Sequence, residues 1–437
     1  MLTAEENETL CRVGPGSAMG DVFRQYWLPI LLSSELPEAD CPPLRVRVLG
    51  EELIAFRQTD SAIGLLANAC PHRGASLFFG RNEDRGLRCV YHGWKFDTSG
   101  ACVDMPNEPA ESNFKHKVRA LAYPCRERNG VIWAYLGPRT EPGPLPDIEW
   151  SLLPPSQVYI SKRFQNCNWA QALEGGIDSS HSAFLHATLS GPPILGDATR
   201  GMDIRMREKH AHFETLQTTY GTAVAARRDA DTDHFYWRIT QFLMPSYTLV
   251  PPYGESAVGG HIWVPLDDQT TMAWTFTWHP ARALTQAEVT GMRNGKGLHY
   301  DLRKLRPATS APDGAWKLTA GPENDYLRDR AAMRTESFSG LPGVAIQDAA
   351  AQESMGAIYN RVQEHLGASD AGIIQVRKQW LDAAQALRER GVIPAGVDDP
   401  AAYRVRAAGV ILPKATDWVQ GSADWLAARE GVLLQSA

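Results

Sequence analysis

Apolar and polar positions alternate in short runs over the first third of the chain. These runs lie at 44–49, 53–56, 87–90 and 131–136, and Gly, Asn and Asp residues separate them. Short β-type runs divided by turn residues predict a small all-β unit. The preceding stretch, 18–30, has apolar residues at helical spacing and predicts a short amphipathic helix that leads into an apolar segment.

Proline is frequent in the stretch that follows this β-rich unit, residues 138–155. Because proline fixes φ and removes a backbone donor, the stretch predicts neither a central strand nor a helix. We interpret it as an interdomain connection, with a long surface loop inside one domain as the alternative. The predicted domains are therefore residues 1–150 and residues 151–437.

The second part predicts a mixture of helix and strand. A helical segment near 168–187 comes first, and an amphipathic helix at 370–390 comes late and ends at Gly391. Residues 284–345 are polar and rich in Gly and Pro, which predicts irregular structure or an oligomer contact. Alternating segments predict longer strands at 202–208, 213–219, 234–249, 259–265 and 271–278.

Composition excludes some classes of function. The 437 residues carry a formal net charge of −6, so no excess of Lys and Arg exists to neutralise nucleic-acid phosphates. The N-terminus is acidic without an apolar core, and no apolar run approaches the ~18 residues of a membrane span, so we expect a cytoplasmic protein. The seven cysteines, an odd number, favour metal ligation over a disulfide framework.

Four potential metal ligands form two close pairs. Cys70 and His72 read C-x-H, and Cys89 and His92 read C-x-x-H after sixteen intervening residues. Zinc accepts the same donor atoms, but one residue between ligands is tighter than usual zinc-finger spacing. Two loop tips that each offer one thiolate and one imidazole suit a [2Fe–2S] cluster in which two His replace two Cys. The spacing therefore predicts such a cluster, with a zinc site as the alternative.

A second cluster lies in the helical segment near 168–187. Asp178, His181 and His186 form the pattern D-x-x-H-x-x-x-x-H. Two His and one carboxylate are the donors of non-heme Fe(II) oxygenases, although a lone His on an apolar helix is usually a core residue. His186 would lie about 140° around an ideal helix from His181, so we expect a break or π-type bulge between them. Asp178 would share a helix face with His181 and could fix the tautomer of its ring.

Several stretches resemble one enzyme superfamily. CPHRGASLFFG and CVYHGWKFDTSG resemble the Rieske domain of ring-hydroxylating oxygenases, and NWAQALEGGIDSSHSAFLH resembles their mononuclear iron segment. QDAAAQESMG and AMGDVFRQYWLPI are similar to the phthalate dioxygenase branch. The resemblance implies an α+β fold class: an N-terminal all-β Rieske domain and an α+β catalytic domain with a curved antiparallel sheet and helices, which is helix-grip-like.

The resemblance also implies two ligand sets. The expected ligands of a Rieske [2Fe–2S] cluster are Cys70, His72, Cys89 and His92. The expected ligands of a mononuclear Fe(II) are His181, His186 and the distant Asp348. Glu353 and Glu336 are the acidic alternatives to Asp348 as a ligand. The alternative role of Asp348 is structural, as a carboxylate that the helix dipole favours near a helix N-terminus.

An electron path between chains follows from the same resemblance. Asp178 would link His181 to His92 of a neighbouring subunit, in a homotrimer or a hexamer of stacked trimers without a β-subunit. The sequence contains no G-x-G-x-x-G fingerprint, so electrons from NADH are expected to arrive through a separate flavin or iron–sulfur reductase.

A substrate carboxylate would favour an arginine fork in the binding site. Arg205 and Arg207 lie on the polar face of the strand predicted at 202–208, and Arg238 lies in a later strand. We predict Arg207 first and Arg238 second as substrate-binding residues. The alternative is that these arginines lie on the solvent-exposed face of a strand. The candidate cavity walls are Phe184, Phe242, Met244 and Tyr247.

Together these features predict the oxygenase component of a Rieske aromatic-ring-hydroxylating dioxygenase. It would use O₂ and reductase-supplied electrons to hydroxylate an aromatic carboxylate, phthalate- or chlorobenzoate-like, by cis-dihydroxylation. A Rieske monooxygenase or O-demethylase of an aromatic ether would use the same metals. A Rieske electron-transfer protein would need no second metal, and a zinc-binding interaction module would lack the cluster.

Overall fold

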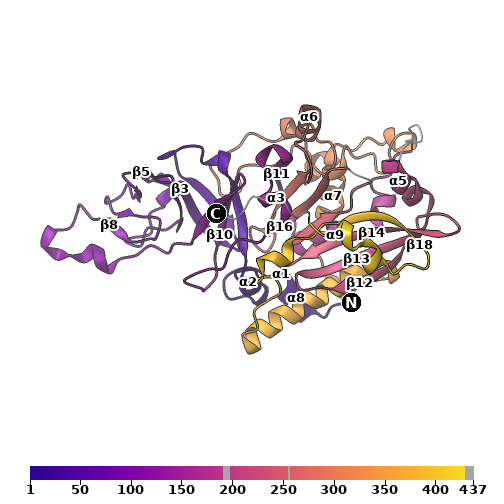
Figure 1. Ribbon diagram of the computed structural model, residues 1–437. Coiled ribbons are helices and arrows are strands. Elements are labelled where there is room, and N and C mark those ends of the chain that lie inside the picture. The colour runs from indigo at the N-terminus through magenta and orange to yellow at the C-terminus, as the bar shows by residue number, and fades with distance from the viewer. Residues whose placement is uncertain (190–196, 254–255, 429–437) are drawn as a thin grey trace.

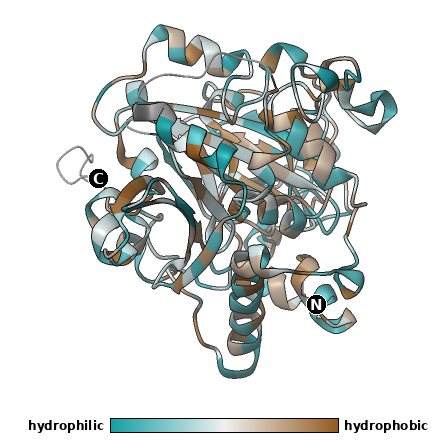
Figure 2. Cartoon of the chain, turned by 90° about the vertical axis from the view of Figure 1, so that its right-hand side faces the viewer, coloured by the Kyte–Doolittle hydropathy of each residue, from teal (hydrophilic) through white to brown (hydrophobic). Residues whose placement is uncertain are grey.

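The computed structural model describes residues 1–189, 197–253 and 256–428 of the chain. A β-rich N-terminal part lies beside a larger part that is built around one long sheet (Figure 1). Hydrophobic residues concentrate in the interior, and hydrophilic residues are frequent on the outer helices and loops (Figure 2). None of the described helices is long and apolar enough to cross a membrane.

The N-terminal part consists of two short helices and three small antiparallel sheets, with strand orders β1-β10-β9, β2-β3-β4 and β5-β6-β7-β8. The helices are α1 (Ala4–Cys11) and α2 (Ala18–Phe23). The strands are β1 (Trp27–Leu32), β2 (Leu44–Val48), β3 (Glu51–Arg57), β4 (Ile63–Ala67), β5 (Arg81–Glu83), β6 (Gly86–Arg88), β7 (Lys95–Phe96), β8 (Cys102–Asp104), β9 (Cys125–Arg128) and β10 (Val131–Tyr135). The expected all-β unit is confirmed. The helix predicted over 18–30 ends at Phe23, and the apolar run that contains Pro29 continues as strand β1, since proline disfavours a helix interior.

An eight-stranded antiparallel sheet forms the body of the second part. Its order is β11-β17-β16-β15-β14-β13-β12, and β18 pairs with the first half of β14. The strands are β11 (Val158–Gln165), β12 (His212–Gln217), β13 (Gly221–Asp229), β14 (His234–Leu243), β15 (Tyr247–Val250), β16 (Val258–Pro265), β17 (Thr271–Trp278) and β18 (Ala408–Pro413). The α+β fold class with an antiparallel sheet is therefore confirmed.

Helices surround this sheet. They are α3 (Glu149–Leu152), α4 (Trp169–Ile177), α5 (Asp197–Arg207), α6 (Gln286–Arg293), α7 (Val344–Glu353), α8 (Ala371–Arg390) and α9 (Trp418–Leu426). The long helix α8 ends at Gly391, which adopts a left-handed conformation with φ of 67°, as the sequence predicts. Apart from α6 and the start of α7, residues 284–345 form short 3-10 helices and irregular segments.

Three expectations about the second part are wrong in detail. Residues 202–207 belong to helix α5 instead of a strand, because an alternation of only six residues also fits a helix and here the segment packs on β13. The run 234–249 forms two strands, β14 and β15. The helix expected near 168–187 ends at Ile177.

One hydrophobic core joins the two parts. Phe23 of α2 and Trp380 of α8 both lie edge-on to Trp169 of α4, with ring centroids 4.7 Å apart in each pair. A second, smaller core fills the end of the N-terminal part, and between residues 66 and 120 the buried apolar residues belong to it alone. We call residues 66–120 the tip. The tip carries the first predicted metal cluster, and the sheet with its helices carries the second.

Candidate metal centres and substrate cavity

Two loops of the tip hold the first cluster. They follow strands β4 and β6, and their potential ligands are Cys70, His72, Cys89 and His92. Both loops close in the same way, since the N–H of Gly74 donates to the Cys70 carbonyl at 2.8 Å and the N–H of Gly93 donates to the Cys89 carbonyl at 3.0 Å. Both glycines have positive φ, 76° and 78°, a conformation that side chains disfavour. The repeated turn lets each loop present one Cys and one His.

The donor atoms of the two loops face one another. The Nδ1 atoms of His72 and His92 lie 3.1 Å apart, and Trp94 stacks on His72 with a centroid distance of 4.3 Å. Cys70 and Cys89 are buried. Burial and the adjacent Cys89 raise the pKa of the Cys70 thiol to about 11, so a thiolate there needs a metal to stabilise it. Two thiols and two inward imidazole nitrogens fit a [2Fe–2S] cluster with mixed ligands.

The second cluster assembles where helix α4 ends. Asp178 has extended backbone just after Ile177, a 3-10 turn follows at η6 (His181–Ala183), and the chain then reaches His186. The segment between the two histidines is irregular, as expected, but the helix already ends at Ile177, before both of them, and not between them. Because the helix ends before Asp178, however, Asp178 and His181 do not share a helix face, and the turn brings their side chains together instead.

The third donor comes from helix α7. Asp348 Oδ1 lies 3.3 Å from His186 Nε2 and 3.7 Å from His181 Nε2, and the two Nε2 atoms are 3.1 Å apart. In the described part of the chain, this is the one group of three or more His, Cys, Asp or Glu side chains whose donor atoms lie within 4.8 Å of one another. We call His181, His186 and Asp348 the triad. Two imidazoles and one carboxylate fit a mononuclear Fe(II) with open positions.

Each imidazole of the triad is oriented through its other nitrogen. His186 Nδ1 lies 2.6 Å from Gln347 Oε1, and the Gln347 amide donates to the Leu341 carbonyl at 3.1 Å. Asp178 Oδ2 lies 3.4 Å from His181 Nδ1. An Nδ1–H that faces an oxygen leaves Nε2 without a proton, which is the form that binds a metal.

The charges around the triad favour ionised carboxylates. Burial acts to raise the pKa of Asp348, but the hydrogen bond with His186 and the nearby charges hold that pKa below its usual value. The pKa of Asp178 is also lowered against its burial, through the contact with His181. Both acids are therefore anionic at neutral pH and can offset the charge of a bound cation.

The two acidic alternatives to Asp348 lie elsewhere. Glu353 accepts hydrogen bonds from the Tyr326 hydroxyl at 2.7 Å and from the Asn166 N–H at 3.0 Å. Glu336 is exposed. Neither joins the triad, so Asp348 is the carboxylate that the structure brings to the two histidines.

A cavity of about 560 Å³ adjoins the triad. All three triad residues line it, together with residues from α5, β14, β16 and β17. Arg205 and Arg238 reach the cavity and are only 7% and 6% exposed. Arg207 does not line it, since its side chain is exposed and donates to the Ala230 carbonyl at 3.1 Å. The helical conformation of 202–207 turns Arg205 inward in place of the predicted Arg207.

The candidate cavity walls predicted from sequence lie outside this cavity. Phe242, Met244 and Tyr247 belong to the main core, and Phe184 is 44% exposed. The side chains that do line the cavity include Tyr253, His261, Trp263 and Thr277. Sequence reasoning missed them, although the alternation along 259–265 already placed residues 261 and 263 on one face.

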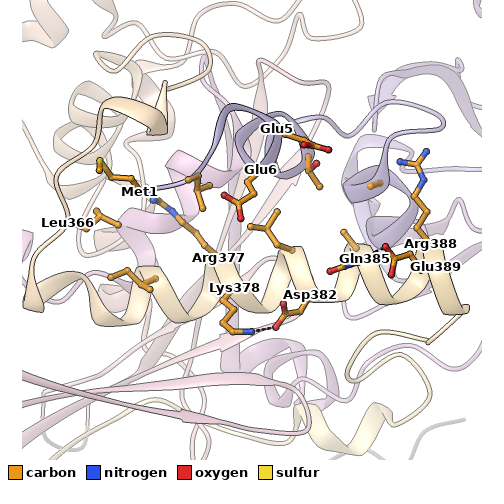
Figure 3. Close-up of a pocket in the computed structure, with 16 residues that line it drawn as sticks. Met1, Glu5, Glu6, Leu366, Arg377, Lys378, Asp382, Gln385, Arg388 and Glu389 are labelled. Atoms are coloured by element: carbon orange, nitrogen blue, oxygen red, sulfur yellow. Dashed lines mark hydrogen bonds and ion pairs between the residues drawn. The ribbon is translucent and has the colours of Figure 1, made fainter.

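A separate hollow of about 630 Å³ lies between α1 and α8 (Figure 3). Charged side chains from both helices line it, and Lys378 and Asp382 pair at 2.6 Å along α8. Its lining includes neither the triad nor the ligands of the tip. Of these two hollows, the cavity at the triad is the one that adjoins a candidate metal centre.

The chain is similar to oxygenase subunits over nearly its whole length. The chain is 38% identical to the 3-chlorobenzoate-3,4-dioxygenase oxygenase subunit of Comamonas testosteroni, over 96% of this chain and 97% of that protein. It is 37% identical to the phthalate 4,5-dioxygenase oxygenase subunit of Pseudomonas putida, over 96% and 94%. It is 33% identical to the 5,5'-dehydrodivanillate O-demethylase oxygenase subunit of Sphingobium sp. (strain NBRC 103272 / SYK-6), over 95% and 87%.

Family models divide the chain in the same order as the fold. Residues 26–122 match the Rieske [2Fe-2S] domain, and residues 134–433 match the family described as LigXa C-terminal domain like. This chain belongs to the Rieske oxygenase family. A solved structure of a Pseudomonas putida CBB5 NdmA variant with theobromine has the same fold as this Rieske oxygenase, with a TM-score of 0.56 at 20% identity, over 91% of this chain and 99% of that chain.

As a Rieske oxygenase subunit, the chain is an oxidoreductase of multicomponent type that uses a [2Fe–2S] cluster and a mononuclear iron. The donors of the tip fit the [2Fe–2S] cluster, and the triad fits the mononuclear iron. Both fits depend on contacts within this chain, namely facing imidazole nitrogens in the tip and convergent Nε2 and carboxylate atoms in the triad.

Proposed function

We propose that this Rieske oxygenase hydroxylates an aromatic ring that carries a carboxylate, phthalate- or chlorobenzoate-like, by cis-dihydroxylation. The observation that carries the proposal is the composition of the cavity, which combines the triad with two buried arginines, Arg205 and Arg238. The relatives named as 3-chlorobenzoate and phthalate dioxygenase subunits support the same substrate class.

The two arginines have no acidic partner among the residues that the structure describes. Arg238 donates from Nη1 to the Pro251 carbonyl at 3.2 Å, while its Nε and the Nε of Arg205 have no hydrogen-bond partner in the described part of the chain. The Tyr253 ring centroid lies 4.9 Å from the Arg238 guanidinium carbon and 5.6 Å from that of Arg205. Buried cations without a counter-charge are costly, so a ligand carboxylate at this end of the cavity would stabilise both.

We assign the metal groups to the residues that fit them. The Rieske cluster is held by Cys70, His72, Cys89 and His92, and the mononuclear iron by His181, His186 and Asp348. When bound, these groups supply the electrons and the activation of O₂. The protein's own residues favour the required form of the ligands, because Gln347 forms a hydrogen bond with the outer nitrogen of His186 and the Asp178 carboxylate lies 3.4 Å from that of His181.

We also propose that the chain works as a homo-oligomer, a trimer or a hexamer of stacked trimers, with a separate reductase as electron donor. Exposed apolar residues on the tip, Phe79, Val90 and Tyr91, support a docking face beside His92. A second exposed apolar group, Phe184, Phe338 and Met355, lies near the triad. Two unlike apolar faces on one chain suit head-to-tail contacts that close into a ring, in which Asp178 would meet His92 of the next copy.

A single-turnover experiment tests the activity. The purified protein is loaded with Fe(II), its cluster is reduced chemically, and phthalate or 3-chlorobenzoate is added with O₂. We expect a product with two added hydroxyl groups on the ring, detected by mass spectrometry, with one cluster and one mononuclear Fe(II) each oxidised by one electron per product. Rapid O₂ consumption without a hydroxylated product from any aromatic carboxylate would overturn the proposed substrate class.

An O-demethylase is the second candidate, because one relative at 33% identity carries that name. The same triad and arginines would serve an aromatic acid with a methoxyl group. Formaldehyde release from methoxybenzoates in the same single turnover would favour this reaction, whereas a cis-diol without formaldehyde would favour dihydroxylation.

A further inference from the structure

One wall of the cavity is polar but uncharged. His261 of β16 and Thr277 of β17 both line the cavity, and neither belongs to the triad or to the arginine pair. The register pairs His261 with Thr275, and Thr277 lies two residues further along β17. Because directly opposed residues and residues two apart share a sheet face, the three side chains form one polar row.

His261 is a neutral hydrogen-bonding group. It is 5% exposed, and its Nδ1 lies 3.1 Å from Thr275 Oγ1. Burial and the charge of Arg163 lower the pKa of His261 to about 3, so the ring is uncharged at neutral pH. Since Nδ1 is the nitrogen that faces β17, Nε2 is the nitrogen left for a ligand in the cavity.

Thr277 is held by a second buried histidine behind the wall. His299 is 1% exposed and lies between two hydroxyls, with Nε2 2.9 Å from Thr277 Oγ1 and Nδ1 2.7 Å from Ser161 Oγ. Burial and the neighbouring His261 lower the pKa of His299 to about 3, so this ring is also neutral and has one donor and one acceptor nitrogen. The contact with His299 uses one side of the Thr277 hydroxyl, and its other hydrogen-bonding capacity remains for the cavity.

The neutral wall lies far from the arginine end of the same cavity. Through strand β15, the register places His261 level with Phe242 of β14, which is four residues from Arg238. Two strand spacings of ~4.8 Å and four residues at ~3.3 Å separate the Cα atoms of Arg238 and His261 by roughly 16 Å. The long arginine side chain spans part of this distance, and a ring with substituents on opposite sides suits the remainder.

A substrate that presented only apolar atoms to this wall would displace water from the unused hydrogen-bonding positions of His261 and Thr277 without replacing those hydrogen bonds, which is unfavourable. We propose that His261 and Thr277 bind an uncharged oxygen substituent on the substrate ring, a hydroxyl or an alkoxyl, opposite the carboxylate that Arg205 and Arg238 hold. This contact fixes the ring in the cavity and sets which ring carbons face the triad. The proposal rests on the proposed function, since it requires a carboxylate at the arginine end.

Binding to the holoenzyme tests this proposal without depending on turnover. Isothermal calorimetry compares benzoate, 4-hydroxybenzoate, 4-methoxybenzoate and phthalate. We expect 4-hydroxybenzoate and 4-methoxybenzoate to bind about tenfold more tightly than benzoate. A tenfold difference is the scale of one or two added hydrogen bonds. In His261→Phe and Thr277→Val this advantage should fall to within about twofold, while benzoate binding changes little and the ratio of hydroxylated regioisomers shifts.

The matched controls are His212→Phe and Thr215→Val, which make the same replacements at exposed positions of β12 and should keep the tenfold preference. If one cavity variant fails to fold, the other still decides the result. Two results would overturn the role of His261 and Thr277 and leave the proposed function standing. One is equal affinity for benzoate, 4-hydroxybenzoate and 4-methoxybenzoate, and the other is a preference for the two substituted acids that survives in both variants. Failure of every aromatic carboxylate to bind would overturn both.

Discussion

Nδ1 of His186 lies 2.6 Å from Oε1 of Gln347, and Gln347 directly precedes Asp348 in helix α7. One helix therefore supplies both a triad carboxylate and the group that orients a triad histidine. The Gln347 amide is itself fixed by the Leu341 carbonyl, so its oxygen is the atom that faces His186. A small shift of α7 would disturb both contacts at once.

Replacing Gln347 by Leu should weaken the mononuclear iron site and spare the cluster. Loss of the oxygen that fixes the His186 tautomer is expected to lower Fe(II) affinity about 10–100-fold. Equilibrium titration of the iron-depleted protein with Fe(II) measures the change, and the visible spectrum reports the intact cluster. Gln385→Leu, at an exposed position of α8, is the control. Equal Fe(II) affinities in the two variants would contradict the orienting role of Gln347.

Asp178→Asn should separate electron delivery from iron binding. The variant keeps the triad, so iron content is expected to stay near that of the unmodified protein. The reduced cluster should nevertheless support product formation at least ~10²-fold more slowly, since the amide no longer offers two acceptor oxygens between His181 and a docked histidine. Rapid-mixing spectroscopy of cluster oxidation gives the rate. An unchanged rate with normal iron content would remove Asp178 from the electron path.

Removing either cavity arginine should affect carboxylate binding more than the chemical step. Arg205→Met and Arg238→Met keep the apolar stem but lose a charged hydrogen bond, which predicts a KM about 10–100-fold higher for aromatic carboxylates. The KM and kcat of the two variants are compared with those of Arg207→Met, whose side chain is exposed. If Arg207→Met alone raised KM, the substrate would enter by a different face of α5.

Glu174 should carry a pH-dependent part of the stability. It accepts charged hydrogen bonds from Arg361 at 3.2 Å and from Arg377 at 2.8 Å, both buried. Burial acts to raise the pKa of Glu174, but the two arginines hold that pKa below its usual value. Its contribution is therefore fully present above the unfolded pKa of ~4.3 and is lost as pH falls through the lower folded pKa.

Glu174→Gln is accordingly expected to lower the free energy of unfolding by about 3–5 kcal/mol at pH 7, because buried Arg361 loses its carboxylate partner and Arg377 keeps only Glu364. The difference from the unmodified protein should shrink as the pH falls below about 4. Urea unfolding at several pH values measures it. A difference that is constant between pH 7 and pH 3 would show that lost packing, not charge, causes the destabilisation.

Local patterns in the sequence were enough to predict the tip but only part of the larger sheet. The pairs Cys70/His72 and Cys89/His92 are close in sequence, so their spacing alone predicts that each loop presents two donors. Strand β13 escaped prediction because its alanines have low strand propensity. Strand β11 escaped because Lys162 and Arg163 are both buried in it, which removes the usual alternation.

The substrate end of the cavity shows a further limit of such patterns. In 202–207 a period of two predicted Arg205 and Arg207 on one face. In helix α5, Met202 and Arg205 instead lie three residues apart on the face that lines the cavity. The sheet beneath α5 decides between the two periods, and that contact is not visible in the local sequence.

The shared core of α2, α4 and α8 has a consequence for how these chains can diverge. A crossover at the proline-rich connection would combine Phe23 from one parent with Trp169 and Trp380 from another, and the two halves of the core would have to match. The buried apolar residues of 66–120 lie in the second core, which they share with Ile54 and Phe56 of β3, so an exchanged tip would have to match these two residues. Genetic exchange of the tip alone could therefore bring in a cluster with a different redox potential while the catalytic half keeps its inherited packing.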